Sequence, residues 1–320
     1  MPAVLVDASG GQIGGAARFK VELRHYLEHT KRQDVRIIGA DRYLGPAWLV
    51  AREFVTSARR RIALNNVGFV SPGGERWALL RNPLDFLTDE EEANADPALR
   101  GANRRRAAVV HLAARRADVL VVPSVGMAKR VMRVLPGLAG RLVVRHHPVS
   151  ADSIPQLPRN PVILCPVLFS PYKDMTERIT ELLRAMDGVA DEGVRLQVTA
   201  NPREVPHALA AHPRIELVGR ISHSDLRGLW ARSRAIYFPP GIESFGYPLA
   251  EARVHGQAVI APDTEQNREV AGQALCGFAL GDITSLQIAV EHALTADVEP
   301  DPAPFDPIAY FDWLLGPSEQ

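Results

Sequence analysis

The chain has 320 residues, of which 46% are apolar and 23% charged. These values are typical of a soluble globular protein and exclude disordered, collagen-like, coiled-coil and small disulfide-rich chains. The 37 Lys and Arg residues balance the 37 Asp and Glu residues, which argues against nucleic acid as the main partner. At this length one hydrophobic core usually divides, so we expect two domains of roughly 150 residues with a cleft between them.

The cysteine content and the first residues indicate the compartment. Two cysteines, Cys165 and Cys276, are too few for a zinc site or a disulfide framework and favour a reducing environment. The sequence starts MPAVLVDASGG, with no basic stretch before its apolar run, and no apolar run is long enough to cross a bilayer. We therefore expect a cytoplasmic protein that is neither secreted nor inserted in a membrane.

The first half alternates between short apolar runs and stretches of helical spacing. Runs of branched residues occur at 3–6, 35–38, 118–122 and 141–144. This alternation predicts an α/β fold with a parallel sheet and helices on its faces. The first run ends in the glycine-rich turn DASGGQIGGAARF, which leads into a predicted helix over 16–29. The turn spells neither a dinucleotide fingerprint nor an ATPase phosphate loop, so both interpretations lose support.

Two further segments of the first half carry specific predictions. In residues 65–80 a Pro-Gly-Gly turn separates two apolar runs, which predicts a hairpin. The stretch from Leu99 to Arg116 contains six arginines around an apolar stripe, and Arg59 to Arg61 forms a second basic run. The long basic helix is compatible with peripheral contact to an anionic membrane, although such runs are more often solvated faces.

The second half repeats the α/β pattern after a linker. Residues 146–161 are rich in proline and lack periodicity, so we place the domain boundary near Ser150. Apolar runs follow at 161–165, 194–198, 214–218, 234–238 and 257–261. Ser222 with Asp225, and Thr284 with Gln287, resemble capping boxes that start helices. Residues 307–315 form a late amphipathic stretch that needs a packing surface.

The most informative segment runs from Pro239 to Asp263. A predicted strand ends at Phe238, a loop with two glycines follows, and a helix is expected to begin near Tyr247 or Pro248. Backbone N–H groups at such a helix start bind anions. Glu243 lies in the loop and Glu251 about two helical turns later, facing the same direction. One carboxylate could hold a sugar hydroxyl and the other a ribose; alternatively, both are solvated surface acids.

A lysine and two histidines are further candidates. Lys173 follows a strand that ends near Cys165, at the sheet edge where α/β proteins bind ligands, and could neutralise a diphosphate or be a surface lysine at a helix start. His146 and His147 adjoin the linker, where they either face the cleft or are structural. The histidines are scattered, and D-x-D and G-x-S-x-G are absent, so we expect neither a metal site nor a serine hydrolase.

These residues resemble the retaining nucleotide-sugar glycosyltransferases of family four. The stretch ESFGYPLAE at 243–251 is similar to that family's E-x7-E motif, and HGQAVIAPDTEQNREVAG resembles the segment that follows it. Looser similarities occur in GGAARF at 14–19, ADVLVVPS at 117–124, FSPYK at 169–173 and VGRIS at 218–222. The resemblance covers residues 160–295 well and the first half loosely.

The resemblance implies an α/β GT-B fold, in which two Rossmann-like domains with parallel sheets face a central cleft. Residues 1–150 would form the acceptor-binding domain and 151–300 the donor-binding domain, with a tail at 301–320 that crosses back to the first domain. The implied reaction is hexose transfer with retention from a nucleotide diphosphate sugar to an acceptor hydroxyl. Neither a metal nor a cofactor is implied.

The resemblance also assigns roles to individual residues. Lys173 would bind the donor diphosphate, Glu251 the ribose hydroxyls and Glu243 the transferred sugar, with Lys173 and Glu243 as the catalytic pair. The remaining implied donor contacts are the backbone of Phe245, Gly246 and Tyr247 at phosphate and sugar, Gly14 and Gly15 at the diphosphate, and Arg220 and Ile221 beside the base.

Two positions depart from the family pattern. The family usually has an arginine five residues before the lysine, and this chain has Leu168 there, which removes one fixed positive charge unless Arg18, Arg145 or Arg220 replaces it. Arg81-Asn82 stands where the family often has a histidine. Other interpretations therefore stay open: a non-catalytic relative that binds a sugar nucleotide or glycan, or an epimerase or phosphorylase on the same fold.

Overall fold

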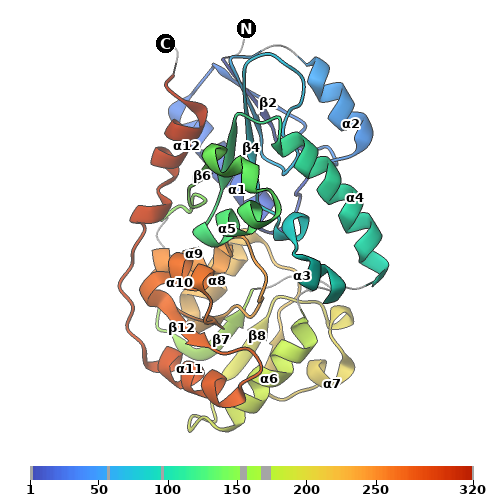
Figure 1. Ribbon diagram of the computed structural model, residues 1–320. Coiled ribbons are helices and arrows are strands. Elements are labelled where there is room, and N and C mark those ends of the chain that lie inside the picture. The colour runs from blue at the N-terminus through green and yellow to red at the C-terminus, as the bar shows by residue number, and fades with distance from the viewer. Residues whose placement is uncertain (1–2, 56–57, 95–96, 152–156, 167–173, 319–320) are drawn as a thin grey trace. The chain divides into compact units, whose positions relative to one another are not determined.

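The computed structural model describes residues 3–55, 58–94, 97–151, 157–166 and 174–318 (Figure 1). The chain forms two compact units. Unit 1 comprises Met1–Ser150 together with Phe305–Gln320, and unit 2 comprises Ala151–Pro304. In the described residues each unit holds one six-stranded sheet whose paired strands are all parallel. The α/β class predicted from the alternation of apolar runs is confirmed.

Unit 1 is a sheet covered by helices. Its strands are β1 (Val4–Asp7), β2 (Val35–Ile38), β3 (Arg60–Ala63), β4 (Glu75–Leu79), β5 (Val119–Val122) and β6 (Leu142–Val144). Its helices are α1 (Gly14–Thr30), α2 (Pro46–Ala51), α3 (Asp89–Asn94), α4 (Pro97–Ala114), α5 (Val125–Val134) and α12 (Pro307–Leu315). The strand order is β2-β1-β3-β4-β5-β6, so the chain reverses its direction across the sheet between β1 and β3.

Unit 2 repeats this plan. Its strands are β7 (Asn160–Cys165), β8 (Arg195–Val198), β9 (Ile215–Leu217), β10 (Ser233–Tyr237), β11 (Ala258–Pro262) and β12 (Leu275–Phe278). Its helices are α6 (Met175–Asp187), α7 (His207–Ala210), α8 (His223–Arg232), α9 (Tyr247–Val254), α10 (Glu265–Ala271) and α11 (Ile283–Thr295). The order β12-β11-β10-β7-β8-β9 reverses between β10 and β7. None of the helices in the described ranges is long and apolar enough to cross a membrane.

The hairpin predicted over residues 65–80 is wrong. β3 ends at Ala63, and β3 and β4 pair in parallel. Parallel neighbours need a crossover connection, and the Pro-Gly-Gly turn belongs to that crossover. Gly74 has a φ of +73°, and a Cβ there would lie 2.1 Å from the carbonyl oxygen of Ala58. The glycine therefore serves a close backbone approach at the start of β4.

The two predicted capping boxes have different outcomes. The Ser222 hydroxyl accepts a hydrogen bond from the backbone N–H of Asp225 (3.1 Å) at the start of α8, so this cap is confirmed. The predicted Thr284 cap is wrong, because α11 already begins at Ile283, one residue before Thr284. Asp282 caps it by accepting hydrogen bonds from the N–H groups of Thr284 (2.9 Å) and Ser285 (3.1 Å). A carboxylate two residues upstream thus displaces the threonine as cap.

The late amphipathic stretch forms α12, which packs on α1 within unit 1. Phe311 is fully buried, with its ring centroid 5.5 Å from that of Phe19 and 5.2 Å from that of Tyr26. The Tyr26 hydroxyl donates a hydrogen bond to Asp312 (2.5 Å). Arg60 donates to the carbonyl of Leu314 at 2.8 Å, so the end of the helix is also tied to the first residue of β3.

Both cysteines are buried thiols on strands of unit 2. Cys165 ends β7 and Cys276 lies in β12, and neither forms a disulfide. Burial raises the pKa of Cys276 to about 11 and raises that of Cys165 further. A buried thiol with a raised pKa is a poor nucleophile and a poor metal ligand, so these side chains contribute to the core and not to chemistry.

We expect Phe311→Ala to lower the free energy of unfolding of unit 1 by about 3 to 5 kcal/mol, because it leaves a cavity under α12. Ile308→Ala is the matched control on the same helix. Its side chain is 42% exposed, so the expected change is within about 1 kcal/mol. Urea unfolding followed by tryptophan fluorescence measures both, and equal losses in the two variants would contradict this account of how α12 is held.

Candidate functional site

The segment singled out from the sequence lies at the carboxyl edge of the unit 2 sheet. β10 ends at Tyr237, residues 238–246 form a loop, and α9 begins at Tyr247, where the sequence predicted a helix start. This loop adjoins the reversal between β10 and β7. In open α/β sheets such a reversal is where the loops diverge and ligands bind. Glu243, Phe245, Gly246 and Glu251 therefore all belong to one loop and helix at this edge of the sheet.

Gly246 fixes the geometry of this loop. Its φ is +79° and its ψ 82°, in the left-handed region, and a Cβ there would lie 2.9 Å from atoms of both Leu249 and Phe238. The Gly246 carbonyl accepts the N–H of Leu249 (2.9 Å) and so closes the first turn of α9. The buried ring of Phe245 packs edge-on against Tyr247, with centroids 5.3 Å apart. Glycine is therefore required where the chain turns into the helix.

The start of α9 has the electrostatic character of an anion site. Among the residues that the structure describes, no side chain forms a capping hydrogen bond at the start of α9, and the first turn of the helix contains no acidic residue. Pro248 presets the helical φ and has no N–H of its own. The positive end of the helix dipole and the N–H groups of this turn suit an anion. Glu243 and Glu251 are both half-buried, on either side of this helix start in the sequence.

Arg220 and Ile221 follow β9 on the same carboxyl edge, separated from β10 by β7 and β8. Arg220 donates to the Glu204 carboxylate at 2.5 Å and to the carbonyl of Thr199 at 3.4 Å. Glu204 also accepts the N–H of Asn201, and these bonds hold its pKa below the usual value. The structure therefore gives Arg220 an ordered position, beside the half-buried Ile221.

Gly14 and Gly15 lie in unit 1, at the start of α1 after the carboxyl end of β1. Both are exposed, and Gly14 has a φ of +64°. Lys20, in the next turn of α1, donates to the carbonyls of Gly10 (3.0 Å) and Ala40 (3.4 Å). Burial, with the nearby Arg81 charge, lowers the pKa of Lys20. The lysine therefore holds the glycine-rich turn in place at the direction reversal of this sheet.

Lys173 and Leu168 lie outside the described residues, so the catalytic role of Lys173 stays a prediction. Each of the three arginines considered as a replacement for the missing family arginine has a partner in its own unit. Arg18 pairs with Glu22 at 2.6 Å, Arg145 stacks on the Trp313 ring at 4.7 Å, and Arg220 pairs with Glu204.

The histidines beside the linker pack in unit 1. His147 is 2% exposed and lies edge-on to Phe19, with ring centroids 5.2 Å apart, while His146 stacks on Phe305 at 5.3 Å. Burial holds the pKa of His147 well below its usual value, so its ring is neutral at physiological pH. Within the described part of the chain, no group of three or more His, Cys, Asp or Glu side chains is arranged to hold a metal.

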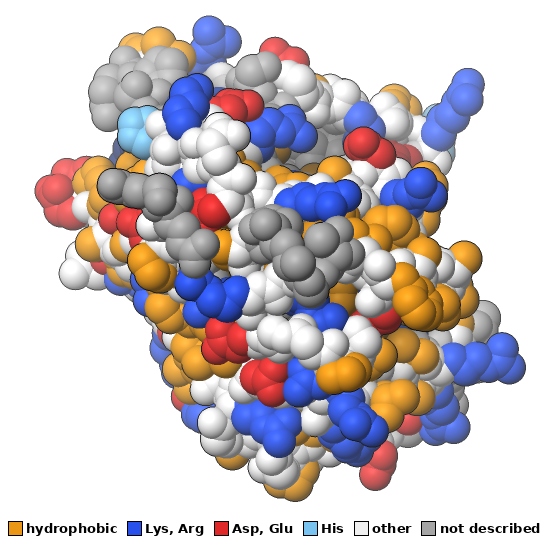
Figure 2. Space-filling view, turned by 90° about the horizontal axis from the view of Figure 1, so that it is seen from above, with side chains coloured by type: hydrophobic (Ala, Val, Ile, Leu, Met, Phe, Trp, Pro, Cys, Tyr) orange, Lys and Arg blue, Asp and Glu red, His pale blue; other side chains and the backbone are white. Residues whose placement is uncertain are grey.

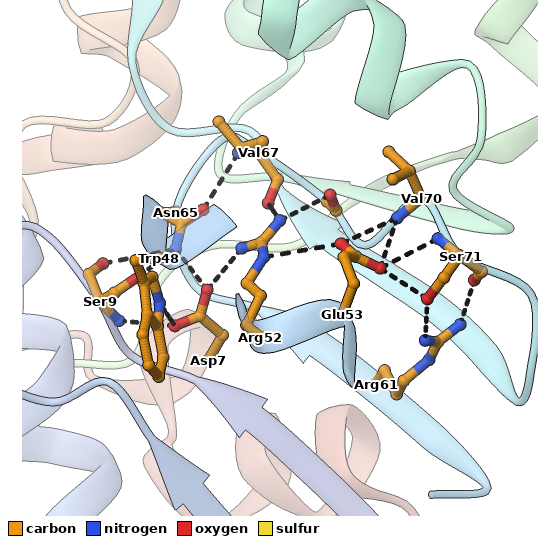
Figure 3. Close-up of polar contacts among 11 residues, drawn as sticks. Asp7, Ser9, Trp48, Arg52, Glu53, Arg61, Asn65, Val67, Val70 and Ser71 are labelled. Atoms are coloured by element: carbon orange, nitrogen blue, oxygen red, sulfur yellow. Dashed lines mark hydrogen bonds and ion pairs between the residues drawn. The ribbon is translucent and has the colours of Figure 1, made fainter. Parts of the chain in front are cut away.

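A buried carboxylate at the end of β1 organises the edge of unit 1, and sequence reasoning missed it. Asp7 is fully buried. It accepts hydrogen bonds from Arg52 (2.5 Å), Trp48 (3.2 Å), Asn65 (3.1 Å) and the N–H of Ser9 (3.0 Å) (Figure 3). The network joins the loop after β1 to the loop after β3. The available signal was an acidic residue closing an otherwise apolar strand, Val4–Asp7.

Arg52 extends this network to the crossover between β3 and β4. Its guanidinium, 1% exposed, also donates to the carbonyls of Val67 and Gly68, each at 2.8 Å. The adjacent Glu53 carboxylate accepts the N–H groups of Val70 (3.2 Å) and Ser71 (2.9 Å). These two side chains supply hydrogen-bond partners for backbone C=O and N–H groups between residues 67 and 71. This explains why the apolar run does not need to pair with a strand.

We expect Arg52→Met to lower the free energy of unfolding by about 3 to 5 kcal/mol, because it leaves the Asp7 carboxylate buried without its cation. Adding Asp7→Asn removes that uncompensated charge, so the double variant should lose less than the sum of the single losses, with a coupling of about 1 to 3 kcal/mol. Urea unfolding of the four proteins gives the cycle, and strictly additive losses would show that the two groups act independently.

Gly246→Ala should destabilise unit 2 by about 1 to 3 kcal/mol, because alanine is strained at this φ and its Cβ collides with two side chains. Gly228→Ala is the control. Gly228 lies inside α8, and a Cβ added there would have no atom within 4 Å, so alanine should be neutral or stabilise by up to about 1 kcal/mol. Calorimetric melting curves distinguish the two variants. A melting temperature of Gly246→Ala equal to that of the parent would refute the requirement for glycine at this turn.

Residues 162–296, which contain the whole loop and helix of the site, match the family model described as glycosyl transferases group 1. No curated protein matches the chain at a significant level by sequence.

The similarity of the chain to solved structures extends over both units. WaaG, a glycosyltransferase involved in lipopolysaccharide biosynthesis, matches with a TM-score of 0.68 and 14% identity, over 96% of this chain and 92% of that chain. Anabaena HepE in complex with UDP and glucose matches with a TM-score of 0.61 and 14% identity, over 98% of this chain and 95% of that chain. Sucrose-phosphate synthase from Thermosynechococcus elongatus matches with a TM-score of 0.62 and 16% identity, over 95% of this chain and 91% of that chain. The chain therefore has the GT-B fold.

Proposed function

We propose that this chain is a retaining glycosyltransferase that moves a hexose from a nucleotide diphosphate sugar to an acceptor hydroxyl without a metal ion. The observation that carries the proposal is the glycine-locked loop and uncapped start of α9 at the sheet reversal of unit 2. This geometry suits a diphosphate. The match of residues 162–296 to a glycosyltransferase family model supports sugar transfer.

The proposed donor site uses the residues at this edge. The diphosphate meets the start of α9 through the backbone of Phe245, Gly246 and Tyr247. Glu251 binds the ribose hydroxyls, Glu243 positions the transferred sugar, and Lys173 adds a positive charge to the diphosphate. A second structure of Anabaena HepE is a complex with UDP-glucose, which makes UDP-hexoses the first donors to test.

The proposed mechanism needs no nucleophile from the protein. The acceptor hydroxyl attacks the anomeric carbon from the face that the diphosphate leaves, and a departing phosphate oxygen takes the hydroxyl proton. The leaving diphosphate gains negative charge, which Lys173 and the helix dipole of α9 stabilise. Glu243 orients the sugar and does not attack it. This division of roles is the reason to propose catalysis without a metal.

In the remaining part of the proposal, unit 1 binds the acceptor, and Gly14 and Gly15 let the diphosphate approach its backbone. The base lies beside Arg220 and Ile221, where the ion pair with Glu204 orders the arginine. The two reduced, buried cysteines support a cytoplasmic location.

A second candidate function is a non-catalytic relative that binds a sugar nucleotide or glycan. Leu168 favours it, because the chain lacks the family's usual arginine at that position. Such a protein would bind donor without transferring or hydrolysing it. An epimerase would convert the free sugar nucleotide, and a phosphorylase would depend on added phosphate.

The test is calorimetric titration with UDP, GDP, ADP, TDP and their hexose conjugates, with and without EDTA, followed by donor-hydrolysis assays. We expect metal-independent binding of one nucleotide class, weakened about tenfold or more by Lys173→Ala and Glu251→Ala, which each remove a charged contact worth roughly 1.5 to 3 kcal/mol. Glu243→Ala should reduce turnover more than affinity.

Glu299→Ala is the matched control, since Glu299 is an exposed carboxylate of unit 2 far along the chain from the site. It should bind and turn over donor like the parent. Site variants that behave like this control would refute the residue assignment. Tight nucleotide binding with neither transfer nor hydrolysis would support the non-catalytic relative instead.

A further inference from the structure

The segment that follows α11 is held on the end of α9, the helix whose start belongs to the candidate site. We call residues 297–304, which lie in unit 2 and lead to Phe305 of unit 1, the returning segment. Asp301 donates its N–H to the carbonyl of Arg253, in the last turn of α9, at 2.9 Å. The Arg253 guanidinium donates to the Asp301 carboxylate at 2.8 and 2.6 Å. The backbone and the side chain of Arg253 therefore both hold the returning segment.

Arg253 also joins these two segments to α10. Its guanidinium donates to the carbonyls of Glu269 (3.1 Å) and Val270 (3.4 Å), near the end of α10. Gly272, directly after α10, makes room for this group. Its φ is +54°, and a Cβ there would lie 3.0 Å from Cζ of Arg253. Three segments, α9, α10 and the returning segment, thus meet at one side chain.

The residues just after α9 fit the same junction. Gly256 has a φ of +60°, and a Cβ there would lie 2.5 Å from the carbonyl oxygen of Val298 and 2.9 Å from the ring of Pro300. The Gly256 carbonyl accepts a hydrogen bond from Arg159, just before β7, at 3.1 Å. A side chain at position 256 would push the returning segment away, so the close approach requires glycine.

This junction differs from an ordinary surface ion pair. Figure 2 shows basic and acidic side chains interspersed over one face of the molecule, and exposed pairs contribute little to stability. The side chain of Arg253 is only 19% exposed. Its loss would remove the donors of a carboxylate and of two backbone carbonyls together.

The two ends of α9 are close enough to affect each other. The helix has eight residues, Tyr247–Val254, of which five are buried, and it is about 12 Å long. Gly246 fixes its start and Arg253 its end. Glu251 precedes Arg253 by two residues on the same short helix. Because a packed helix of two turns moves as one body, a shift at its end also displaces Glu251 and the helix start.

We propose that Arg253 is a positioning residue for the nucleotide diphosphate. By tying the end of α9 to α10 and to the returning segment, it holds the helix start and Glu251 in the arrangement that binds the ligand. This inference rests on the proposed donor site. A site that is already arranged avoids the cost of ordering it on binding. The coupling is reciprocal, so nucleotide at the start of α9 stabilises the hydrogen bond between Asp301 and Arg253 at its end.

The test uses the full chain and the diphosphate among UDP, GDP, ADP and TDP that the parent binds, in calorimetric titrations. Arg253→Met keeps the apolar part of the side chain and should weaken binding about fivefold or more. Arg253→Lys keeps the charge without the guanidinium fork and should recover part of this loss. Asp301→Ala should also weaken binding. The double variant Arg253→Met/Asp301→Ala should bind like Arg253→Met alone, since both changes act through one junction.

Hydrogen exchange gives a readout that a purely structural role would not change. Pro300 and Pro302 have no N–H, so Asp301 carries the only backbone N–H of residues 300–302. Saturating nucleotide should slow the exchange of this N–H about fivefold or more in the parent, because its bond to the Arg253 carbonyl becomes more stable. In Arg253→Met the nucleotide should leave this exchange rate nearly unchanged.

Arg130→Met is the matched control. Arg130 of α5, in unit 1, donates to the Glu91 carboxylate at 2.6 and 2.8 Å, and its side chain is 18% exposed. The ion pair and its burial are therefore comparable to those of Arg253. This variant should bind nucleotide like the parent even if its melting temperature falls. Circular dichroism melts set a titration temperature at which every variant is folded.

The possible failures can be told apart. If Arg253→Met binds nucleotide as tightly as the parent, or Arg130→Met loses as much affinity, Arg253 has no positioning role and the proposed function still stands. The same holds if nucleotide leaves the exchange of the Asp301 N–H unchanged in the parent. A parent that binds none of the four diphosphates would overturn the proposed function and this inference with it.

Discussion

A buried ion pair between Asp7 and Arg52 determines how the carboxyl edge of unit 1 is built. The carboxylate ends β1 and collects donors from three other segments, while the guanidinium reaches on to the β3–β4 crossover. Isolated burial of either charge would be strongly unfavourable, so each is retained only with the other and with the surrounding hydrogen bonds. The pair thereby fixes both the loop that follows β1 and the crossover between β3 and β4.

In unit 2 the loop after β10 is fixed by its backbone conformation. Its loop after β10 is turned into α9 by Gly246, whose φ and crowded surroundings exclude a side chain. The sheet edge of unit 1 thus depends on side chains far apart in the sequence, whereas the loop after β10 in unit 2 depends on a few consecutive residues. This difference explains why the two sites were not equally visible in the sequence.

The predictions that held depend on local pattern. Branched apolar runs identified nine strands within a residue or two, and the start of α9 followed from Gly246 and Pro248. β3 was missed because Arg60 and Arg61 made it look like a basic run. In the structure Arg60 stacks on Trp77 at 4.2 Å, and Arg61 donates to the Ser71 hydroxyl at 2.9 Å, so both arginines are accommodated within the sheet. Residues 60–63 therefore form a strand because of contacts with residues distant in the sequence, which local pattern does not reveal.

The predictions that failed share this dependence on distant partners. The hairpin at 65–80 looked self-contained, but the apolar run before the turn is bound by Arg52 and Glu53, which precede it by at least fourteen residues. The candidate donor-binding residues at 243–251 were visible because they are contiguous. Asp7 was not visible, since an aspartate at a strand end is informative only when its partners Trp48, Arg52 and Asn65 are known.

The packing of α12 on α1 has a consequence for synthesis of the chain. Phe19 and Tyr26 are made early, yet the side chain that covers them, Phe311, is made about 290 residues later. All of unit 2 is translated in between, and its residues are contiguous. Unit 2 can therefore complete its core on the ribosome before unit 1 can. During that interval Phe19 and Tyr26 of α1 lack the side chain that covers them in the finished protein.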